Sequence, residues 1–336
     1  MFGERMQAVY LVPTREGGVY EYRSVKKPGA SGGQVLVRVH AAGINRGEIL
    51  MVRGFRSDDP RFKPVPSGIE FAGEIVEVGD DATGWHVGER VMGRGMGSYA
   101  DYALAGSMNL MRIPDSLSYV EAAAIPNVFI TAHDALVTNA QVQSGDVVLV
   151  TAASSGIGTA AIQLAKFFGA QKVLASTRGA NKIAALRDVG ADVVIDTSRP
   201  DYAALIDRET DGDGVDIVID SVGGPMFANI LDALAIKGRM VTVGRNGGDL
   251  GQINLDVLAN KRAQIIGVTF RTRTPQEAWR CFEVFVEDCM DGFADGSLRP
   301  VVDRTFDFAA LHEAHDYMMG NHQVGKIVLL RDWVQA

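Results

Sequence analysis

Hydrophobic and polar residues follow two different patterns along this chain, and the change comes near residue 120. In residues 34–41 a valine or an alanine occupies every second position, which is nearly the period of a half-buried strand. Similar short runs, separated by glycine, proline and aspartate, occur at 70–79, 90–93 and 98–105. The first third of the chain is therefore predicted to be rich in β-structure.

From residue 146 onward, continuous apolar runs alternate with helical patterns. Residues 147–150 are such a run, and after a loop of small residues apolar side chains recur at helical spacing from Ile157 to Phe168. The alternation repeats at 172–176, 181–189, 192–196, 200–209, 215–220, 225–235, 240–243 and 264–269. Strands that are apolar throughout indicate a parallel sheet covered on both faces. We expect a doubly wound α/β domain of the Rossmann type with six parallel strands, then one long helix after Pro275.

The charge balance and the cysteine content narrow the function classes. The 336 residues include 33 Lys and Arg against 41 Asp and Glu, a net charge of -8, which argues against nucleic acid or a membrane surface and favours a small-molecule partner. The only cysteines are Cys281 and Cys289, too few for a disulfide framework. Without a signal-like N-terminus or a long apolar run, the cytoplasm is the expected compartment.

A loop of small residues, 151–158, leaves a predicted strand and opens a predicted helix. Backbone amides at such a helix start favour a pyrophosphate, so Ser155, Gly156 and Ile157 are expected to contact a dinucleotide. The spacing is a degraded form of Gly-x-Gly-x-x-Gly, and the alternative is a turn that only allows tight packing of helix on sheet. The further strands behind the loop favour the dinucleotide site.

The end of the second strand of this domain indicates which dinucleotide binds. NAD enzymes place a carboxylate there, whereas this chain has Ser176, Thr177 and Arg178, with Lys182 one turn later. Hydroxyl groups and two cations would bind a 2′-phosphate that a carboxylate would repel, so NADP(H) is the predicted cofactor. The alternative is that Arg178 and Lys182 lie on a solvated helix start.

Several segments together resemble one family over nearly the whole chain. They are 42–48, 68–79, 190–196, 216–224, 238–241 and 325–329. The chain resembles the medium-chain dehydrogenases/reductases, and within them the zinc-free quinone oxidoreductase (zeta-crystallin-like) branch; segment 122–136 also resembles enoyl reductase modules of polyketide synthases. This resemblance implies a β-rich GroES-like substrate domain at 1–122, an NADP(H)-binding Rossmann domain at 123–268, and a segment at 269–336 that returns to the GroES-like domain.

The same resemblance implies that no catalytic metal is present. Zinc-dependent relatives carry their ligands at positions that fall here on Asn45, Ile69 and about Asn127, and neither an amide nor an isoleucine replaces a thiolate or an imidazole. A second group, His312, His315 and His322, is interpreted as a solvated helix face rather than a replacement metal site.

Further site residues are implied by the resemblance. Additional coenzyme contacts are expected at Asn45, Thr131, Ser221, Val222, Gly244, Arg245, Val268, Phe270 and Lys326. Expected catalytic residues are Asn45, as a donor to a developing oxyanion or to water; Glu48, in a proton relay; and Thr131, near the nicotinamide. The alternatives are that Asn45 only caps a loop and that Glu48 only pairs with Arg46 or Arg53. Phe55, Met92 and Phe129, with Phe270, either line an apolar substrate pocket or belong to the core.

These residues predict NADPH-dependent reduction of a conjugated carbonyl acceptor. Hydride addition to a quinone or an α,β-unsaturated ketone delocalises the developing charge, so hydrogen-bond donors can replace a Lewis acid. One alternative is an enoyl-thioester reductase acting on acyl-CoA or a carrier protein, and another is a non-catalytic NADPH-binding protein. The strand at 264–269 is expected at the edge of the sheet, where a second copy would pair with it to form a homodimer.

Overall fold

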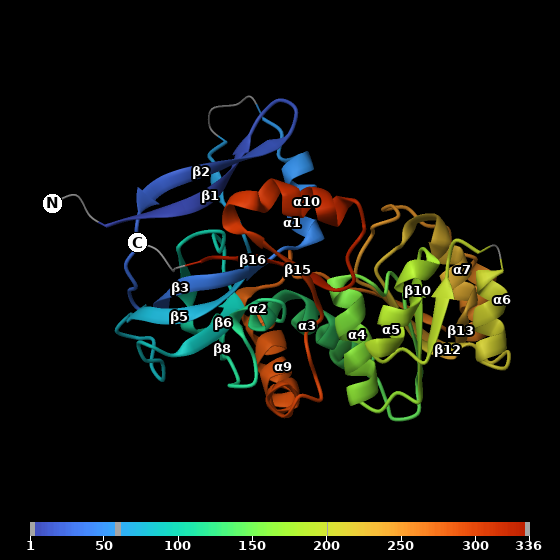
Figure 1. Ribbon diagram of the computed structural model, residues 1–336. Helices are drawn as coiled ribbons and strands as arrows, with labels where there is room; N and C mark the ends of the chain where they lie inside the picture. The colour runs from blue at the N-terminus through green and yellow to red at the C-terminus, as the bar shows by residue number, and fades with distance from the viewer. Residues whose placement is uncertain (1–3, 58–61, 200, 333–336) are drawn as a thin grey trace. The chain divides into compact units, whose positions relative to one another are not determined.

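The computed structural model describes residues 4–57, 62–199 and 201–332 and divides into two compact units (Figure 1). The first unit consists of Met1–Asn127, Phe293–Gly296 and Val302–Ala336, and the second of Val128–Gly292 and Ser297–Val301. The expected third segment, 269–336, is thus divided between them, because most of its long helix belongs to the second unit.

The first unit is built on antiparallel strands, as its alternating pattern predicts. Its larger sheet has the order β15-β16-β3-β5-β6-β8, with β7 also paired to β3, and only β15 and β16 run parallel. These strands are β3 (Gln34–Gly43), β5 (Glu70–Val78), β6 (Arg90–Arg94), β7 (Tyr102–Gly106), β8 (Leu110–Arg112), β15 (Val302–Asp307) and β16 (Lys326–Leu330). A smaller sheet has the order β2-β1-β4, from β1 (Arg5–Pro13), β2 (Gly18–Lys26) and β4 (Val65–Pro66).

Short helices complete the first unit. They are α1 (Arg46–Gly54), η1 (Ser107–Asn109), α2 (Tyr119–Ala122), η5 (Phe308–Ala310) and α10 (Leu311–Met319), and α3 (Pro126–His133) begins at the end of its sequence. The core packs inward-facing residues of the sheet, such as Val37 and Ile75, against Leu311 of α10. On α10, His315 is only 7% exposed and meets the Tyr20 ring edge-on at 5.1 Å, so the interpretation of a solvated face is wrong for this residue, although His312 is exposed.

The second unit contains the predicted six-stranded sheet. All its neighbouring strands are parallel, in the order β11-β10-β9-β12-β13-β14, which is the doubly wound arrangement 3-2-1-4-5-6. The strands are β9 (Val147–Val150), β10 (Lys172–Thr177), β11 (Val193–Asp196), β12 (Val215–Asp220), β13 (Leu234–Thr242) and β14 (Gln264–Gly267). The fold class expected from the apolar runs is therefore confirmed.

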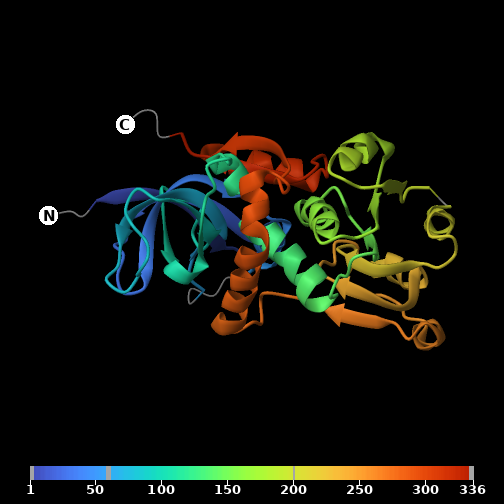
Figure 2. The ribbon, with the colours of Figure 1, turned by 90° about the horizontal axis from the view of Figure 1, so that it is seen from below.

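Helices connect these strands. They are α4 (Gly156–Phe167), η3 (Ala180–Lys182), α5 (Ile183–Asp188), α6 (Tyr202–Glu209), η4 (Gly224–Met226), α7 (Phe227–Asp232), α8 (Leu255–Lys261) and α9 (Pro275–Asp295), while the π-helical turn η2 (Asp134–Asn139) prolongs α3. Figure 2 shows α9 as the long orange helix. None of the described helices is long and apolar enough to cross a membrane.

Two predicted elements differ from those observed. The helix predicted at 225–235 is shorter, because Leu234 already pairs with Val215 and begins β13. The strand predicted at 98–105 begins only at Tyr102, because the preceding residues form separate backbone hydrogen bonds, such as Tyr99 N to Ser67 O at 2.9 Å.

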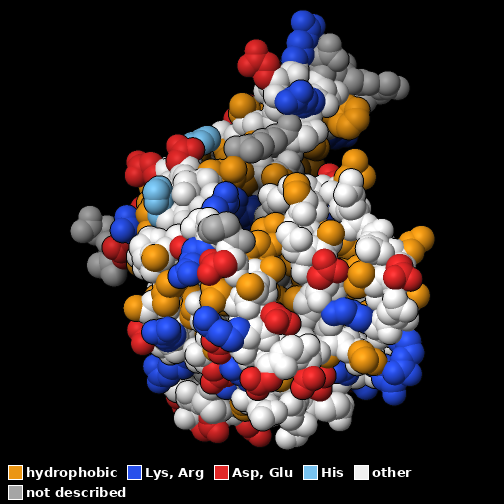
Figure 3. Space-filling model, turned by 90° about the vertical axis from the view of Figure 1, so that its right-hand side faces the viewer, with side chains coloured by type: hydrophobic (Ala, Val, Ile, Leu, Met, Phe, Trp, Pro, Cys, Tyr) orange, Lys and Arg blue, Asp and Glu red, His pale blue; other side chains and the backbone are white. Residues whose placement is uncertain are grey.

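On the face that Figure 3 shows, acidic and basic side chains of the described residues are interspersed and form no continuous basic surface.

Candidate functional site

Most of the sequence-predicted coenzyme residues of the second unit gather at one edge of its sheet. Residues 155–157 follow β9, residues 176–178 end β10, and the predicted contacts within 221–222, 244–245 and 268–270 follow β12, β13 and β14. Because carboxyl ends of parallel strands meet at the same edge, the structure brings these residues together. The order of the strands changes direction between β9 and β12, which is where doubly wound sheets bind their ligands.

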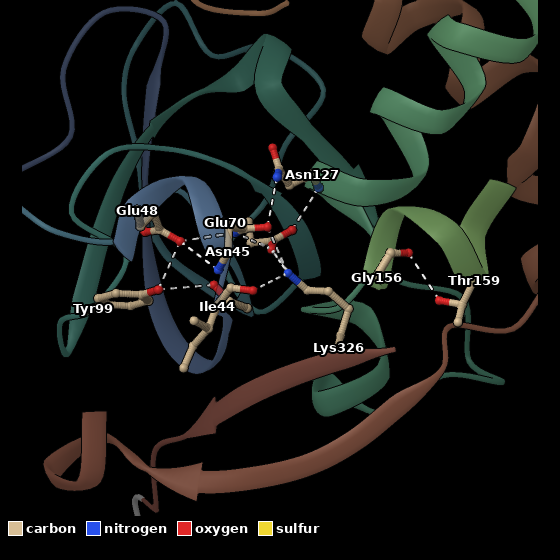
Figure 4. A network of polar contacts seen from close by, with 10 residues as sticks. Ile44, Asn45, Glu48, Glu70, Tyr99, Asn127, Gly156, Thr159 and Lys326 are labelled. Atoms are coloured by element: carbon tan, nitrogen blue, oxygen red, sulfur yellow. Dashed lines mark hydrogen bonds and ion pairs between the residues drawn. The ribbon is translucent and has the colours of Figure 1, made fainter. Parts of the chain in front are cut away.

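The loop after β9 is shaped by small residues. The Ser155 hydroxyl accepts a hydrogen bond from Gly158 N at 3.1 Å and caps α4, and Thr159 donates to the carbonyl of Gly156 (Figure 4). A Cβ atom at Gly158 would lie 2.5 Å from the carbonyl oxygen of Ala153, so only glycine fits there. Tight packing and an amide-lined helix start are therefore properties of the same loop.

A buried cation lies near this loop. Lys182 is only 8% exposed, and its Nζ donates to the Ser154 hydroxyl at 3.2 Å. It does not lie on a solvated helix start, whereas Arg178 is exposed. The carboxylate of Asp196, at the end of the adjacent β11, accepts from Gly179 N at 3.0 Å and Ser198 N at 2.9 Å. These bonds lower the pKa of Asp196, and the carboxylate holds the backbone of this region.

The remaining predicted residues of the second unit differ in exposure. Ser221 is buried after β12, Val222 is half-buried, and Arg245 is exposed after β13. Val268 is 8% exposed, and the guanidinium of Arg273 lies 4.7 Å from the centre of the Phe270 ring. Gly244 packs against Ser221, and Thr131 is half-buried in α3.

The second unit thus fits a phosphorylated dinucleotide. The start of α4 supplies backbone amides, and Lys182 supplies a positive charge next to the Ser154 hydroxyl of the same loop. Hydroxyl groups of Ser176 and Thr177 lie at the end of the neighbouring strand. These groups would hold phosphate oxygens.

In the first unit, Asn45 is the centre of a buried polar network (Figure 4). Its Nδ2 donates to Glu70 Oε1 at 2.8 Å and to Glu48 Oε2 at 3.2 Å. Its Oδ1 accepts from Lys326 Nζ at 2.9 Å and from Asn127 Nδ2 at 2.8 Å. Two donated and two accepted bonds exhaust the side-chain amide. In this arrangement Asn45 has no N–H left for an oxyanion, so it orients its neighbours instead.

Lys326 and Glu70 form the charged pair of the network. Lys326 Nζ donates to Glu70 Oε1 at 2.6 Å and to Ile44 O at 2.7 Å, besides Asn45, so all three of its N–H groups have acceptors within the first unit. Glu70 is fully buried and also accepts from Asn127 N at 2.7 Å. The expected direct coenzyme contact of Lys326 would require one of these bonds to be exchanged.

Glu48 lies on the other side of Asn45. Its Oε2 accepts from Asn45 N at 3.0 Å and from the Tyr99 hydroxyl at 3.1 Å, while its buried Oε1 has no hydrogen-bond partner among the described residues. Burial raises the pKa of Glu48 to about 7, opposed by the hydrogen bond from Asn45 and assisted by the charge of Glu70. Arg46 donates to Met318 O and to Asn321, and the side chain of Arg53 lies outside the described residues.

The expected substrate-pocket residues do not share one environment. Met92 is fully buried in β6, and Phe129 is 2% exposed in α3, so neither side chain presents surface to a ligand in this structure. Phe55 is half-buried at the end of α1. Met92 and Phe129 are therefore core residues in this structure, which is the alternative to a place in the substrate pocket.

Sequence reasoning missed several residues of these networks. Glu70 and Tyr99 surround Asn45 in the first unit, and Thr151 and Asp220 link two strand ends in the second. A glutamate beside an apolar run such as Phe71-Ala72 is a signal for a buried charge that needs a partner. The partner of Glu70 is Lys326, 256 positions away, and no local sequence pattern connects the two residues.

Comparisons with known proteins agree with this architecture. Residues 31–115 match the alcohol dehydrogenase GroES-like domain, and residues 156–287 match a domain described as zinc-binding dehydrogenase. Quinone oxidoreductase of Homo sapiens is 33% identical over 302 residues, which cover 88% of this chain and 89% of the human protein. The chain belongs to the medium-chain dehydrogenases/reductases, in their quinone oxidoreductase branch.

Solved structures of this dehydrogenase/reductase fold are also similar. A mycobacterial protein complexed with NADPH has a TM-score of 0.85 at 26% identity, with 97% of this chain and 99% of that chain covered. The enoyl reductase JamJ has a TM-score of 0.82 at 27% identity, with 97% of this chain and 100% of that chain covered. The chain is thus an oxidoreductase of a family that uses nicotinamide coenzymes.

Although one matched domain of this dehydrogenase/reductase is described as zinc-binding, the residues at the implied ligand positions do not fit zinc. They are Asn45, Ile69 and Asn127, which offer neither a thiolate nor an imidazole. The ammonium group of Lys326, 2.9 Å from Asn45 Oδ1, would repel a second cation. Within 4–57, 62–199 and 201–332, no group of three or more His, Cys, Asp or Glu side chains could hold a metal ion.

Proposed function

We propose that this protein is an NADPH-dependent oxidoreductase that reduces a conjugated carbonyl acceptor, a quinone or an α,β-unsaturated ketone, without a catalytic metal. The observation that carries the proposal is the Asn45 network: Asn45 and Asn127 stand at two of the positions that the family resemblance associates with metal ligands, and Asn45 accepts hydrogen bonds from Asn127 and from the Lys326 ammonium. An acceptor that delocalises its own negative charge needs no Lewis acid.

When bound, the coenzyme supplies the hydride. The chain's own residues hold it in place: the amides at the start of α4 and the cations Lys182 and Arg178 bind its phosphates. Thr131, Ser221, Val222, Gly244, Arg245, Val268 and Phe270 are proposed as further contacts. The main contribution of the protein to catalysis is to place the acceptor carbon at about 3–3.5 Å from C4 of the nicotinamide.

The residues of the first unit support this reaction indirectly. Glu48 and Lys326 fix both ends of the Asn45 amide, so we assign them to positioning rather than to direct contact with the acceptor. The donor of the proton that completes reduction is water, because the side-chain N–H groups of Asn45 and Lys326 and the Tyr99 hydroxyl already donate hydrogen bonds within the network. Solvent can supply protons to a reduced quinone or to an enolate.

Coenzyme preference tests the role of Lys182 and Arg178. Kinetics with NADPH and NADH should show a higher kcat/KM for NADPH. Lys182→Ala should lower kcat/KM for NADPH roughly 10- to 100-fold, the effect of one charged hydrogen bond, and leave the value for NADH within about twofold. Arg187→Ala, an exposed substitution on α5, is the control. A wild-type preference for NADH would contradict the proposal.

A second function is favoured by the similarity to the JamJ enoyl reductase: reduction of an enoyl thioester on CoA or a carrier protein. Oxidation of NADPH, followed by absorbance, should be compared with benzoquinone, with an α,β-unsaturated ketone and with crotonyl-CoA. A higher kcat/KM for the quinone or the ketone supports the first proposal, and a higher value for the thioester supports the second. Binding of NADPH without oxidation by any acceptor would indicate a non-catalytic protein.

We further propose that the protein is a homodimer. β14 is the last strand of the six-stranded sheet, and an open edge pairs readily with a second copy. Light scattering at micromolar concentration should give twice the mass of 36.0 kDa, and a monomer would contradict the proposal.

We also propose the cytoplasm as the compartment of this protein. Both cysteines are buried and free, in accordance with a reducing environment.

A further inference from the structure

A buried carboxylate lies where β12 ends. Asp220 has no exposed surface, and its Oδ1 accepts from the Thr151 hydroxyl at 2.7 Å and from Val222 N at 2.9 Å. Its Oδ2 accepts from Gly223 N at 3.0 Å. Burial raises the pKa of Asp220, opposed by these hydrogen bonds. The side chain therefore determines the path of the backbone directly after the strand.

Thr151, directly after β9, completes this arrangement. Its hydroxyl donates to Asp220 and accepts from Ser221 N at 2.9 Å. One hydroxyl group thus connects the ends of two neighbouring strands, at the point where the strand order changes direction. Thr151 is 1% exposed, so water cannot replace it without rearrangement.

The turn that Asp220 holds supports a second loop. Asn246 N donates to Ser221 O at 3.3 Å, and Gly247 N donates to Val222 O at 2.7 Å. At Gly224, with φ of +57°, a Cβ atom would lie 2.5 Å from the carbonyl oxygen of Gly247. The loop that follows β13 therefore takes its shape from the turn that follows β12.

We propose that Thr151 and Asp220 are positioning residues for the coenzyme: together they hold the turn 221–224, and through it the loop 244–248, in the form that binds the dinucleotide. This inference rests on the proposed function, because it takes Ser221, Val222, Gly244 and Arg245 as coenzyme contacts. Neither Thr151 nor Asp220 is assigned a contact of its own. Their effect is on the affinity for the coenzyme and not on the chemical step.

The test compares two buried threonines of the second unit. Thr151→Val removes the hydroxyl that bridges Asp220 and Ser221, whereas Thr151→Ser keeps it. Thr210→Val is the matched control: this hydroxyl donates to Ile206 O at 3.0 Å, accepts from Gly214 N at 3.2 Å and belongs to a residue that is 8% exposed, outside the two loops. The Kd for NADPH, from quenching of protein fluorescence, and the Tm are measured for each variant.

Thr151→Val should raise the Kd roughly tenfold, because a buried donor and acceptor lose their partner. Thr151→Val and Thr210→Val should lower the Tm by similar amounts, but Thr210→Val should leave the Kd within about twofold of the wild-type value. Thr151→Ser should restore the wild-type Kd. A second variant, Asp220→Asn, places an amide N–H against Gly223 N–H and should also raise the Kd. Equal Kd values for Thr151→Val and Thr210→Val would overturn the inference. If the wild-type protein does not bind NADPH, the proposed function itself fails.

Discussion

Removal of the Lys326 ammonium group should be among the most damaging single changes in the first unit. Lys326→Met keeps the length of the side chain but leaves Glu70 Oε1, Asn45 Oδ1 and Ile44 O without their common donor. The two side chains of the ion pair are 4% and 0% exposed. Loss of one partner of such a pair costs about 3–5 kcal/mol, because an uncompensated charge stays buried. At about 2–4 °C per kcal/mol, the Tm should fall by roughly 6–20 °C.

Thermal unfolding followed by circular dichroism at pH 7 measures this effect. The control is Lys172→Met, which breaks the pair with Glu209 at 3.1 Å; those side chains are 32% and 27% exposed, so the loss should stay near 0–1 kcal/mol, about the value of exposed pairs. The double variant Lys326→Met/Glu70→Gln removes both charges and should recover part of the stability. A Tm for Lys326→Met within about 2 °C of wild type would refute the assignment of a buried ion pair.

Three further results are expected. Folding raises the pKa of Glu48 from 4.5 to about 7, so between pH 4.5 and 7 the folded chain binds more protons than the unfolded chain. The free energy of unfolding should therefore fall by about 3 kcal/mol as the pH rises through this window. Urea unfolding of Glu48→Gln should lack this decline. An equal pH profile in both proteins would contradict the shift. Asn45→Asp adds a third carboxylate beside Glu48 and Glu70, so it should lower the Tm by several degrees and kcat/KM by at least about tenfold, with unchanged kinetics as the contrary result. Treatment with EDTA should leave oxidation of NADPH unchanged, and loss of turnover that zinc restores would contradict a metal-free reaction.

The order of elements could be predicted because local patterns determine it. The apolar run 147–150 and the helical spacing that follows it predict β9 and α4, and the same alternation predicts all six strands of the parallel sheet. Boundaries were predicted less well where long-range pairing determines them. The pairing of Val215 with Leu234, for instance, ends the predicted helix 225–235 early.

The candidate site could be predicted only in part. The loop after β9 and the cations Arg178 and Lys182 belong to short segments with their own spacing, but the burial of Lys182 was not visible in the sequence. Asn45 was expected from the resemblance, whereas its surroundings depend on Glu70, Tyr99 and Lys326, which only the folded sheet brings together. The sequence alone does not show that the Asn45 amide forms four hydrogen bonds within this network.

The most direct test of hydride transfer uses NADPH deuterated at C4 of the nicotinamide, prepared separately with each C4 hydrogen replaced. The protein is mixed with either preparation and an α,β-unsaturated ketone, and the product is analysed by mass spectrometry and NMR. One of the two preparations should transfer deuterium to the carbon β to the carbonyl group, while the α-hydrogen comes from solvent. Product without deuterium from either preparation, or no oxidation of NADPH by the ketone or by a quinone, would contradict hydride transfer from NADPH to a conjugated acceptor.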